Sequence, residues 1–114
     1  MPKYRVSATD VEWIERDISG NRFKTLGYHE NLAMVICQTN AGWEVGFHHH
    51  PNEECAYYLK GSSQITIGEE TFVARAGDYV FIPPNVPHKV KVFEDTEFIA
   101  ASSPPKPVYK PTEK

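Results

Sequence analysis

The sequence has little of what marks secreted or membrane-bound proteins. It contains two cysteines in 114 residues, too few for a disulfide framework, and we expect Cys37 and Cys55 to be free thiols that pack within strands. No stretch approaches the ~20 apolar residues of a membrane helix, and residues 1–17 lack the apolar core of a secretory leader. These absences predict a cytoplasmic protein without a membrane partner.

Positive charge is also scarce. Lys and Arg number 12 against 15 Asp and Glu, which gives a formal net charge of -3. Nucleic-acid-binding domains carry a dense basic patch, and no run of Lys or Arg here is dense enough to form one, so we expect no nucleic-acid partner. A chain of this length holds one hydrophobic core, which predicts a single domain over residues 1–114.

Segments with the helical period of 3.6 residues are missing, and short strand-like runs take their place. We predict strands over the run LAMVICQT and over 43–50, 54–60, 62–67, 71–75, 78–82, 88–93 and 97–101. Turn residues separate these runs at Gly61, Gly68, Gly77, Pro83-Pro84-Asn85 and Glu94-Asp95. This cadence predicts an all-β barrel or sandwich.

The two ends of the chain are less regular. An apolar group of Val11, Trp13, Ile14 and Ile18 fits a strand or a short helical turn, and Ser19-Gly20-Asn21 marks a turn after it. The tail is rich in proline, which cannot donate to a strand ladder. We predict a barrel core over about 28–103 and an extended tail over 104–114, which either lies on the barrel or on a neighbouring molecule, or is disordered.

The stretch HHHPNEE combines imidazoles with a carboxylate. His48, His50 and Glu54 are two and then four residues apart, so a strand would direct all three to one face. The same parity directs His49 and Glu53 away from that face, and we interpret His49 as a surface or interface residue.

A second stretch brings a further imidazole. After a proline-rich turn, His88, Val90 and Val92 alternate with two lysines, which places His88 on the buried face. Imidazole and carboxylate donors together suit a divalent transition metal. We predict one such ion, bound by His48, His50, Glu54 and His88.

These two stretches resemble the two motifs of the cupin superfamily. The first motif is matched by Gly42, His48-x-His50, Glu54 and Gly61, and the second by Gly77, Pro83-x-Asn85 and His88. Asn85 stands where the family usually has glycine, and Val92 where it usually has asparagine. The resemblance spans roughly residues 31–103. It implies a small antiparallel barrel of the cupin (double-stranded β-helix, jelly-roll) type, with one metal on three His and one Glu.

Residues 27–87 are also similar to small cupins that linearise unsaturated uronates, through GYHENLAMV, HHHPNEE, YYLKGS and AGDYVFIPPNVPH. In that family an acid, an aromatic and an arginine, from the last strand and beyond, serve catalysis. Ala100, Ser102 and Lys106 stand at the matching positions here, so the catalytic set differs. Glu54 replaces the Gln that the compared members have as a ligand, which moves the site toward the dioxygenase-like set.

Strand parity also predicts the walls of a small, mostly apolar pocket. We expect these walls to include Met34, Ile36, Gln38, Tyr58, Val90 and Phe98, with the neighbours of Leu32 on the other face of the strand as the alternative to the first three. Three imidazoles and one carboxylate leave two adjacent positions of an octahedral ion open, which suits a substrate that binds through oxygen. The ion is iron, manganese, nickel, zinc or copper, and the residues do not distinguish among these.

From these features we predict a metal-dependent enzyme acting on a small oxygenated organic molecule, with dioxygenase-type chemistry and Glu54 as the proton acceptor. The alternatives are a uronate-like isomerase or cyclase using the same metal, and a metal-containing protein that only binds its ligand. We also predict a homodimer, because Trp43, Val45 and Phe47 are expected to form an apolar strip on the face opposite the ligands.

Overall fold

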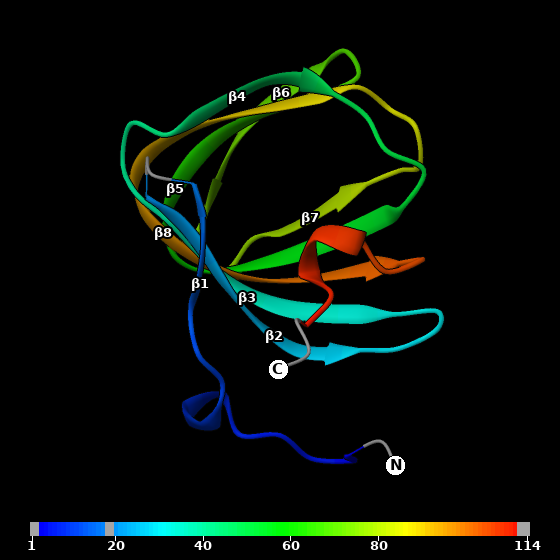
Figure 1. Ribbon diagram of the computed structural model, residues 1–114. Helices are drawn as coiled ribbons and strands as arrows, with labels where there is room; N and C mark the ends of the chain where they lie inside the picture. The colour runs from blue at the N-terminus through cyan, green and yellow to red at the C-terminus, as the bar shows by residue number, and fades with distance from the viewer. Residues whose placement is uncertain (1–2, 18–19, 112–114) are drawn as a thin grey trace.

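A computed structural model describes residues 3–17 and 20–111 of the chain (Figure 1). Its strands form one curled sheet: β1 (Ile14–Asp17), β2 (Asn21–Tyr28), β3 (Ala33–Thr39), β4 (Glu44–His48), β5 (Glu53–Ile67), β6 (Glu70–Arg75), β7 (Tyr79–Ile82) and β8 (His88–Ser103). Two short 3₁₀ helices, η1 (Ala8–Asp10) and η2 (Pro107–Tyr109), flank the sheet. No helix in the described ranges is long and apolar enough to span a membrane. The all-β barrel predicted from the sequence is confirmed.

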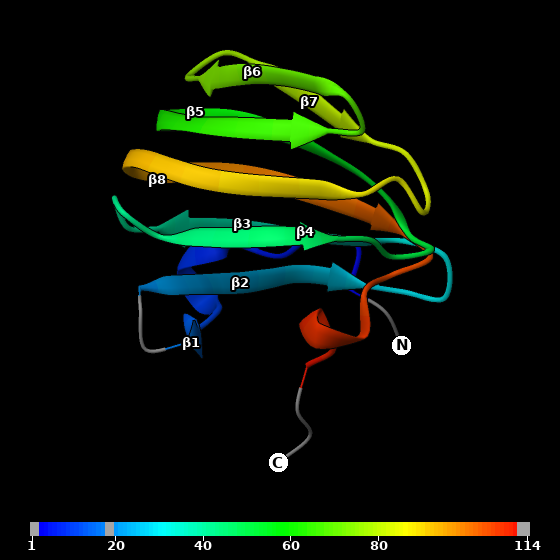
Figure 2. The same ribbon diagram turned by 90° about the horizontal axis from the view of Figure 1, so that it is seen from above.

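The two longest strands, β5 and β8, bend and belong to both halves of the sheet (Figure 2). The first half of β5 pairs with β7 and its second half with β6, while β8 pairs first with β4 and then with β3. The predicted breaks at Gly61 and Glu94-Asp95 are therefore wrong, because the chain bends there without leaving the sheet. Gly61 has φ +83°, and a Cβ on it would collide with the carbonyl oxygen of Asp95, so glycine permits this close crossing.

The core lies between the two halves, in two apolar clusters. One cluster consists of Phe23, Val35, Cys37, Ala100 and Tyr109, and the other of Tyr58, Ile65, Ala74 and Val80. Both cysteines are free thiols, as predicted; Cys37 is buried in the first cluster and Cys55 is half-buried.

The sheet extends beyond the limits predicted for the barrel. β1 and β2 add to its edge next to β3, and Phe23 of β2 is buried in the core. Trp13 lies just before β1, with the Arg22 guanidinium 4.4 Å and the Lys24 ammonium 4.9 Å from its ring centroid. Ile18 and Ser19, which we assigned to the apolar group and to the following turn, lie outside the described residues.

The proline-rich tail docks on the barrel over its described part, residues 104–111, which decides among the alternatives predicted for it (Figure 1). Tyr109 is 4 % exposed and packs edge-on against Phe23, with ring centroids 4.9 Å apart. The hydroxyl of Thr25 donates a 2.7 Å hydrogen bond to the Tyr109 carbonyl oxygen. The tail thus forms part of the core.

The apolar strip predicted on the outside of β4 is wrong for two of its members. Val45 pairs with Val90 and His48 with His88, so β4 advances by one residue more than β8 between these pairs. This bulge turns Trp43 and Val45 into the barrel on the same side as His48. Phe47 alone is exposed, with the Lys89 ammonium 4.8 Å from its ring centroid. The homodimer stays a prediction without this strip as its support.

The docking of the tail can be tested with paired substitutions in η2. Replacing Tyr109 with Ala removes a buried ring and should lower the free energy of unfolding by about 3 kcal/mol. Val108 is 45 % exposed, so Val108→Ala should change it by less than about 0.5 kcal/mol. Urea unfolding followed by circular dichroism measures both values. Equal effects of the two substitutions would mean that the tail does not pack as described.

Candidate metal site and cavity

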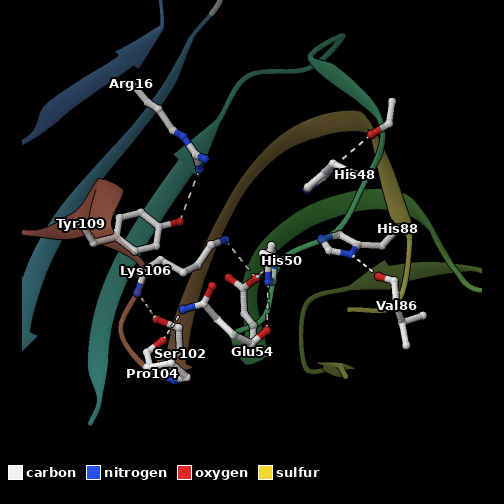
Figure 3. Close-up of polar contacts among 12 residues, drawn as sticks. Arg16, His48, His50, Glu54, Val86, His88, Ser102, Pro104, Lys106 and Tyr109 are labelled. Atoms are coloured by element: carbon white, nitrogen blue, oxygen red, sulfur yellow. Dashed lines mark hydrogen bonds and ion pairs between the residues drawn. The ribbon is translucent and has the colours of Figure 1, made fainter. Parts of the chain in front are cut away.

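Three histidines converge inside one end of the barrel (Figure 3). His48 ends β4, His50 follows in the loop to β5, and His88 begins β8 directly opposite His48 in the strand register. One ring nitrogen from each lies within 4.8 Å of the others. The ring centroids of His48 and His88 are 4.2 Å apart, and those of His50 and His88 are 4.9 Å apart. The predicted convergence of the three imidazoles is confirmed.

Backbone carbonyls orient all three rings. Each Nδ1 lies 2.9 Å from a carbonyl oxygen, that of Gly46 for His48, of Asn52 for His50 and of Val86 for His88. A carbonyl only accepts hydrogen bonds, so we assign the proton of each neutral ring to Nδ1, which leaves a lone pair on Nε2. The Nε2 of His50 is buried and has no hydrogen-bond partner. Metal-binding histidines are oriented in this way, so these residues fit a metal ion.

The two loops that carry these histidines are joined by the backbone. The amide of Asn85 donates a 2.8 Å hydrogen bond to the carbonyl oxygen of His50. Asn85 has φ +62°, the positive value for which Asn is one of the better-tolerated residues after glycine. The substitution of Asn for the usual motif glycine is thus accommodated, and the turn holds His50 and His88 at a fixed separation.

Glu54 lies next to this cluster but is not one of its three members. Its Oε1 is 3.6 Å from Nε2 of His50, too far for a hydrogen bond, and 3.2 Å from the ammonium nitrogen of Lys106. Burial alone would raise the pKa of the Glu54 carboxyl, but the His50 imidazole and the Lys106 ammonium together hold that pKa below its usual value. The carboxylate is thus ionised beside the histidines, and its role as a fourth ligand stays a prediction.

His88 is the most enclosed of the three imidazoles. Burial has the largest effect and lowers the pKa of His88. The hydrogen bond to the Val86 carbonyl and the Glu54 carboxylate act in the opposite direction, while the imidazoles of His48 and His50 lower the pKa further. A lowered pKa favours the neutral ring, which is the form that binds a metal. His49 and Glu53, which parity directs away from the site, are exposed.

Two of the histidines, His48 and His88, line a cavity of about 360 Å³ inside the barrel. Of the predicted wall residues, Tyr58, Val90 and Phe98 line it. Met34, Ile36 and Gln38 do not: Met34 is 43 % exposed, and the Gln38 side chain bonds to Arg22 and Glu97 on the outer surface. The inward residues of β3 are Val35, Cys37 and Thr39, because the opposite parity is the buried one. Both faces of β3 are largely apolar, so the hydrophobic pattern did not distinguish them.

The cavity also contains polar groups from both ends of the chain, which the motifs do not mark. Arg16 of β1, Lys106 and Tyr109 line it, and Arg16 donates a hydrogen bond of 3.4 Å to the Tyr109 hydroxyl (Figure 3). Burial raises the pKa of Cys37, which also lines the cavity, to about 12, so this thiol is no nucleophile. Only Lys106 had a sequence signal, its alignment with a catalytic arginine of the uronate-linearising cupins.

The metal assignment can be tested by removing one imidazole. We expect His88→Ala to lower metal affinity by more than the roughly 10–100-fold that loss of an outer hydrogen-bond partner costs, because a direct ligand is lost. Elemental analysis after expression with iron, manganese, nickel, zinc or copper measures the bound metal. His49→Ala is the matched control, since His49 lies between two ligands in sequence but is exposed. Full retention of metal by His88→Ala, or a wild type empty under every condition, would refute the assignment.

Comparisons with known proteins agree with this fold. The family profile described as "Cupin domain" matches residues 35–101. An uncharacterised protein of Methanocaldococcus jannaschii is 35 % identical over 66 residues, which span 57 % of this chain and 51 % of that protein, about half its length.

Two solved structures share the fold over nearly the whole chain. An RmlC-like cupin from Shewanella frigidimarina superposes with a TM-score of 0.88 at 22 % identity, covering 96 % of this chain and 97 % of that chain. KdgF from a Halomonas species gives a TM-score of 0.83 at 18 % identity, covering 94 % and 97 %. At such identities the likeness shows the fold alone. The family profile matches more than half of this chain, and the chain therefore belongs to the cupin family.

Proposed function

We propose that this cupin is a metal-dependent enzyme that removes a proton from carbon beside an oxygen function of a small organic substrate. The observation that carries the proposal is the position of Glu54, an ionised carboxylate beside the three-histidine cluster and inside the cavity. A divalent metal on these histidines would supply open positions for the substrate oxygen and polarise its carbonyl. Glu54 is then a base within reach of the adjacent C–H group.

Proton transfer at this site is balanced by the residues present. The C–H proton passes to the Glu54 carboxylate, and the electron pair of that bond remains on the substrate as an enolate. The ammonium of Lys106, 3.2 Å from Glu54, provides positive charge next to the developing negative charge. A carboxylate has two oxygens, so ligation through one leaves the other to accept the proton.

The cavity walls support reaction inside the barrel. Tyr58 and Phe98 stack with centroids 5.2 Å apart, and Val90 and Val92 continue the apolar lining toward the histidines. Such walls exclude water around the reacting atoms, which strengthens the electrostatic effect of Lys106 and Glu54. The volume of about 360 Å³ fits a small molecule.

The enolate has two fates, which correspond to the two classes of chemistry considered from the sequence. In the oxygen-independent fate, the proton returns to a different carbon and the substrate is isomerised. In the dioxygenase-type fate, dioxygen is the oxidant and both of its atoms enter the product. A site with three imidazoles and open positions favours this second candidate, since related donor sets bind dioxygen beside a substrate.

Glu54→Gln tests the shared first step. The amide still coordinates weakly but cannot accept the proton, so we expect metal to be largely retained and turnover to fall about 10²- to 10⁴-fold. Exchange of substrate C–H for deuterium in heavy water, measured by NMR on a panel of enolisable carbonyl compounds, reports proton removal directly. Glu53→Gln changes the neighbouring exposed carboxylate and should leave exchange unchanged.

The same assay run without oxygen separates the two fates. Undiminished anaerobic conversion would exclude the dioxygenase and leave the isomerase. Conversion that requires oxygen and consumes it would support the dioxygenase. A metal-loaded wild type that exchanges no proton on any compound, in air or without it, would overturn the proposal in favour of a protein that only binds its ligand.

A further inference from the structure

The end of the cavity next to Lys106 carries more positive charge than the proposed chemistry needs. Arg16 and Lys106 both line the cavity and lie on the same aromatic ring, with the guanidinium carbon 5.8 Å and the ammonium nitrogen 5.6 Å from the centroid of Tyr109. They come from opposite ends of the chain, β1 and the segment after β8, and the docked tail brings them together (Figure 3).

The charges that face the cavity do not cancel. Among its described lining residues, Glu54 is the one carboxylate, against the two cations Arg16 and Lys106. The lining therefore has a net charge of +1, and a divalent ion on the histidines raises this to +3. The chain as a whole has a net charge of -3, so the positive charge is specific to the cavity. This excess of positive charge favours an anionic occupant.

The two cations are held differently. The Lys106 ammonium is already paired with Glu54, and its side chain is 14 % exposed. Arg16 instead contacts the ring and the hydroxyl of Tyr109. The hydroxyl of Tyr109 accepts the hydrogen bond of Arg16 and also interacts with the Cys37 thiol. Rotation of its O–H bond toward a bound ligand would let it donate into the cavity. Among the residues that line the cavity, the one carboxylate, Glu54, pairs with Lys106, so the Arg16 guanidinium remains as a further cation there.

We propose that Arg16, Lys106 and Tyr109 form a carboxylate-binding subsite, so that the substrate is a small organic acid with its reacting oxygen at the histidines and its carboxylate at this subsite. The proposal rests on the proposed function for the identity of the reacting end. A guanidinium matches the planar carboxylate with two parallel hydrogen bonds, and a buried ammonium and a phenol add further donors. The proposed subsite gives strand β1 and the tail a common role, since β1 supplies Arg16 and the tail supplies Lys106 and Tyr109.

The separation of the two ends limits the size of the acid. Lys106 Nζ is 3.2 Å from Glu54 Oε1, which is 3.6 Å from Nε2 of His50. The carboxylate and the reacting oxygen are therefore a few bonds apart in one molecule. Keto acids such as 4-oxopentanoate and 5-oxohexanoate have this form. Their neutral counterparts, 2,5-hexanedione and 2,6-heptanedione, replace the carboxylate with an acetyl group and change little else.

Calorimetric titration of the metal-loaded full chain with these acid–ketone pairs, without oxygen, tests the subsite. We expect each acid to bind at least about tenfold more tightly than its diketone, as a charge-assisted contact provides. Arg16→Gln and Lys106→Gln should each reduce this preference at least about threefold, whereas Lys106→Arg should retain it. Lys110→Gln, an exposed lysine of the same tail, is the control and should change nothing. Inorganic phosphate should bind more weakly than either acid.

Several outcomes would overturn the subsite. The first is that the wild type binds acid and diketone equally, or binds neither in the millimolar range. The second is that Arg16→Gln leaves the preference for the acid unchanged. The third is that phosphate binds more tightly than the acids. Arg16 is exposed, so its substitution does not endanger folding even if Lys106→Gln does. Binding needs no turnover. If the protein prefers acids but exchanges no proton, the subsite is supported and the proposed enzyme is refuted. If it exchanges protons but shows no preference for acids, the subsite alone is refuted.

Discussion

The antiparallel pairing of β5 with β8 determines where every group of the site lies. Its register sets Ile67 opposite His88 at one end and Glu54 opposite Ser102 at the other. β4 then pairs with the first part of β8 and brings His48 directly across from His88. Both long strands bend where they cross at Gly61 and Asp95, so the ladder closes around a cavity. A slip of one residue in this register would turn Glu54 of β5 and His88 of β8 to opposite faces of the sheet.

The three-histidine cluster was predictable because each of its members lies in a short stretch with a local signal. His48 and His50 lie within three residues, and His88 follows a turn whose proline and asparagine residues prescribe its conformation. Parity alone gave the correct result for His88, Val90 and Val92, since β8 has one buried face there. On β4 parity failed, because a bulge has no sequence signature and reverses which residues face inward. The prediction of the inward face of β3 failed for another reason, because both faces of that strand are largely apolar.

The groups from the two chain ends could not be predicted, since they depend on long-range packing. Tyr109 looks like one aromatic residue in a proline-rich tail, yet it completes a core cluster with Phe23 from β2. Lys106 reaches the cavity because the chain turns back after β8, where its amide donates to the Ser102 hydroxyl. The prolines exclude a continued strand but do not exclude a docked segment. Periodicity detects strands and longer helices, and the one helix of this segment, η2, is three residues long.

The ion pair of Lys106 and Glu54 links the docking of the tail to the charge of the site. Both side chains are largely buried, at 14 % and 11 % exposed, and either one alone would be an uncompensated charge in a low-dielectric interior. The tail cannot leave without exposing Tyr109 and removing the cation beside Glu54. The carboxylate therefore favours the docked tail, and the docked tail holds an ammonium against the carboxylate. A divalent ion would compete with Lys106 for Glu54, and a bound anion would compete with Glu54 for Lys106, so either one would weaken the pair. The segment that encloses the cavity is thus held partly by the charges that the site presents to its ligands.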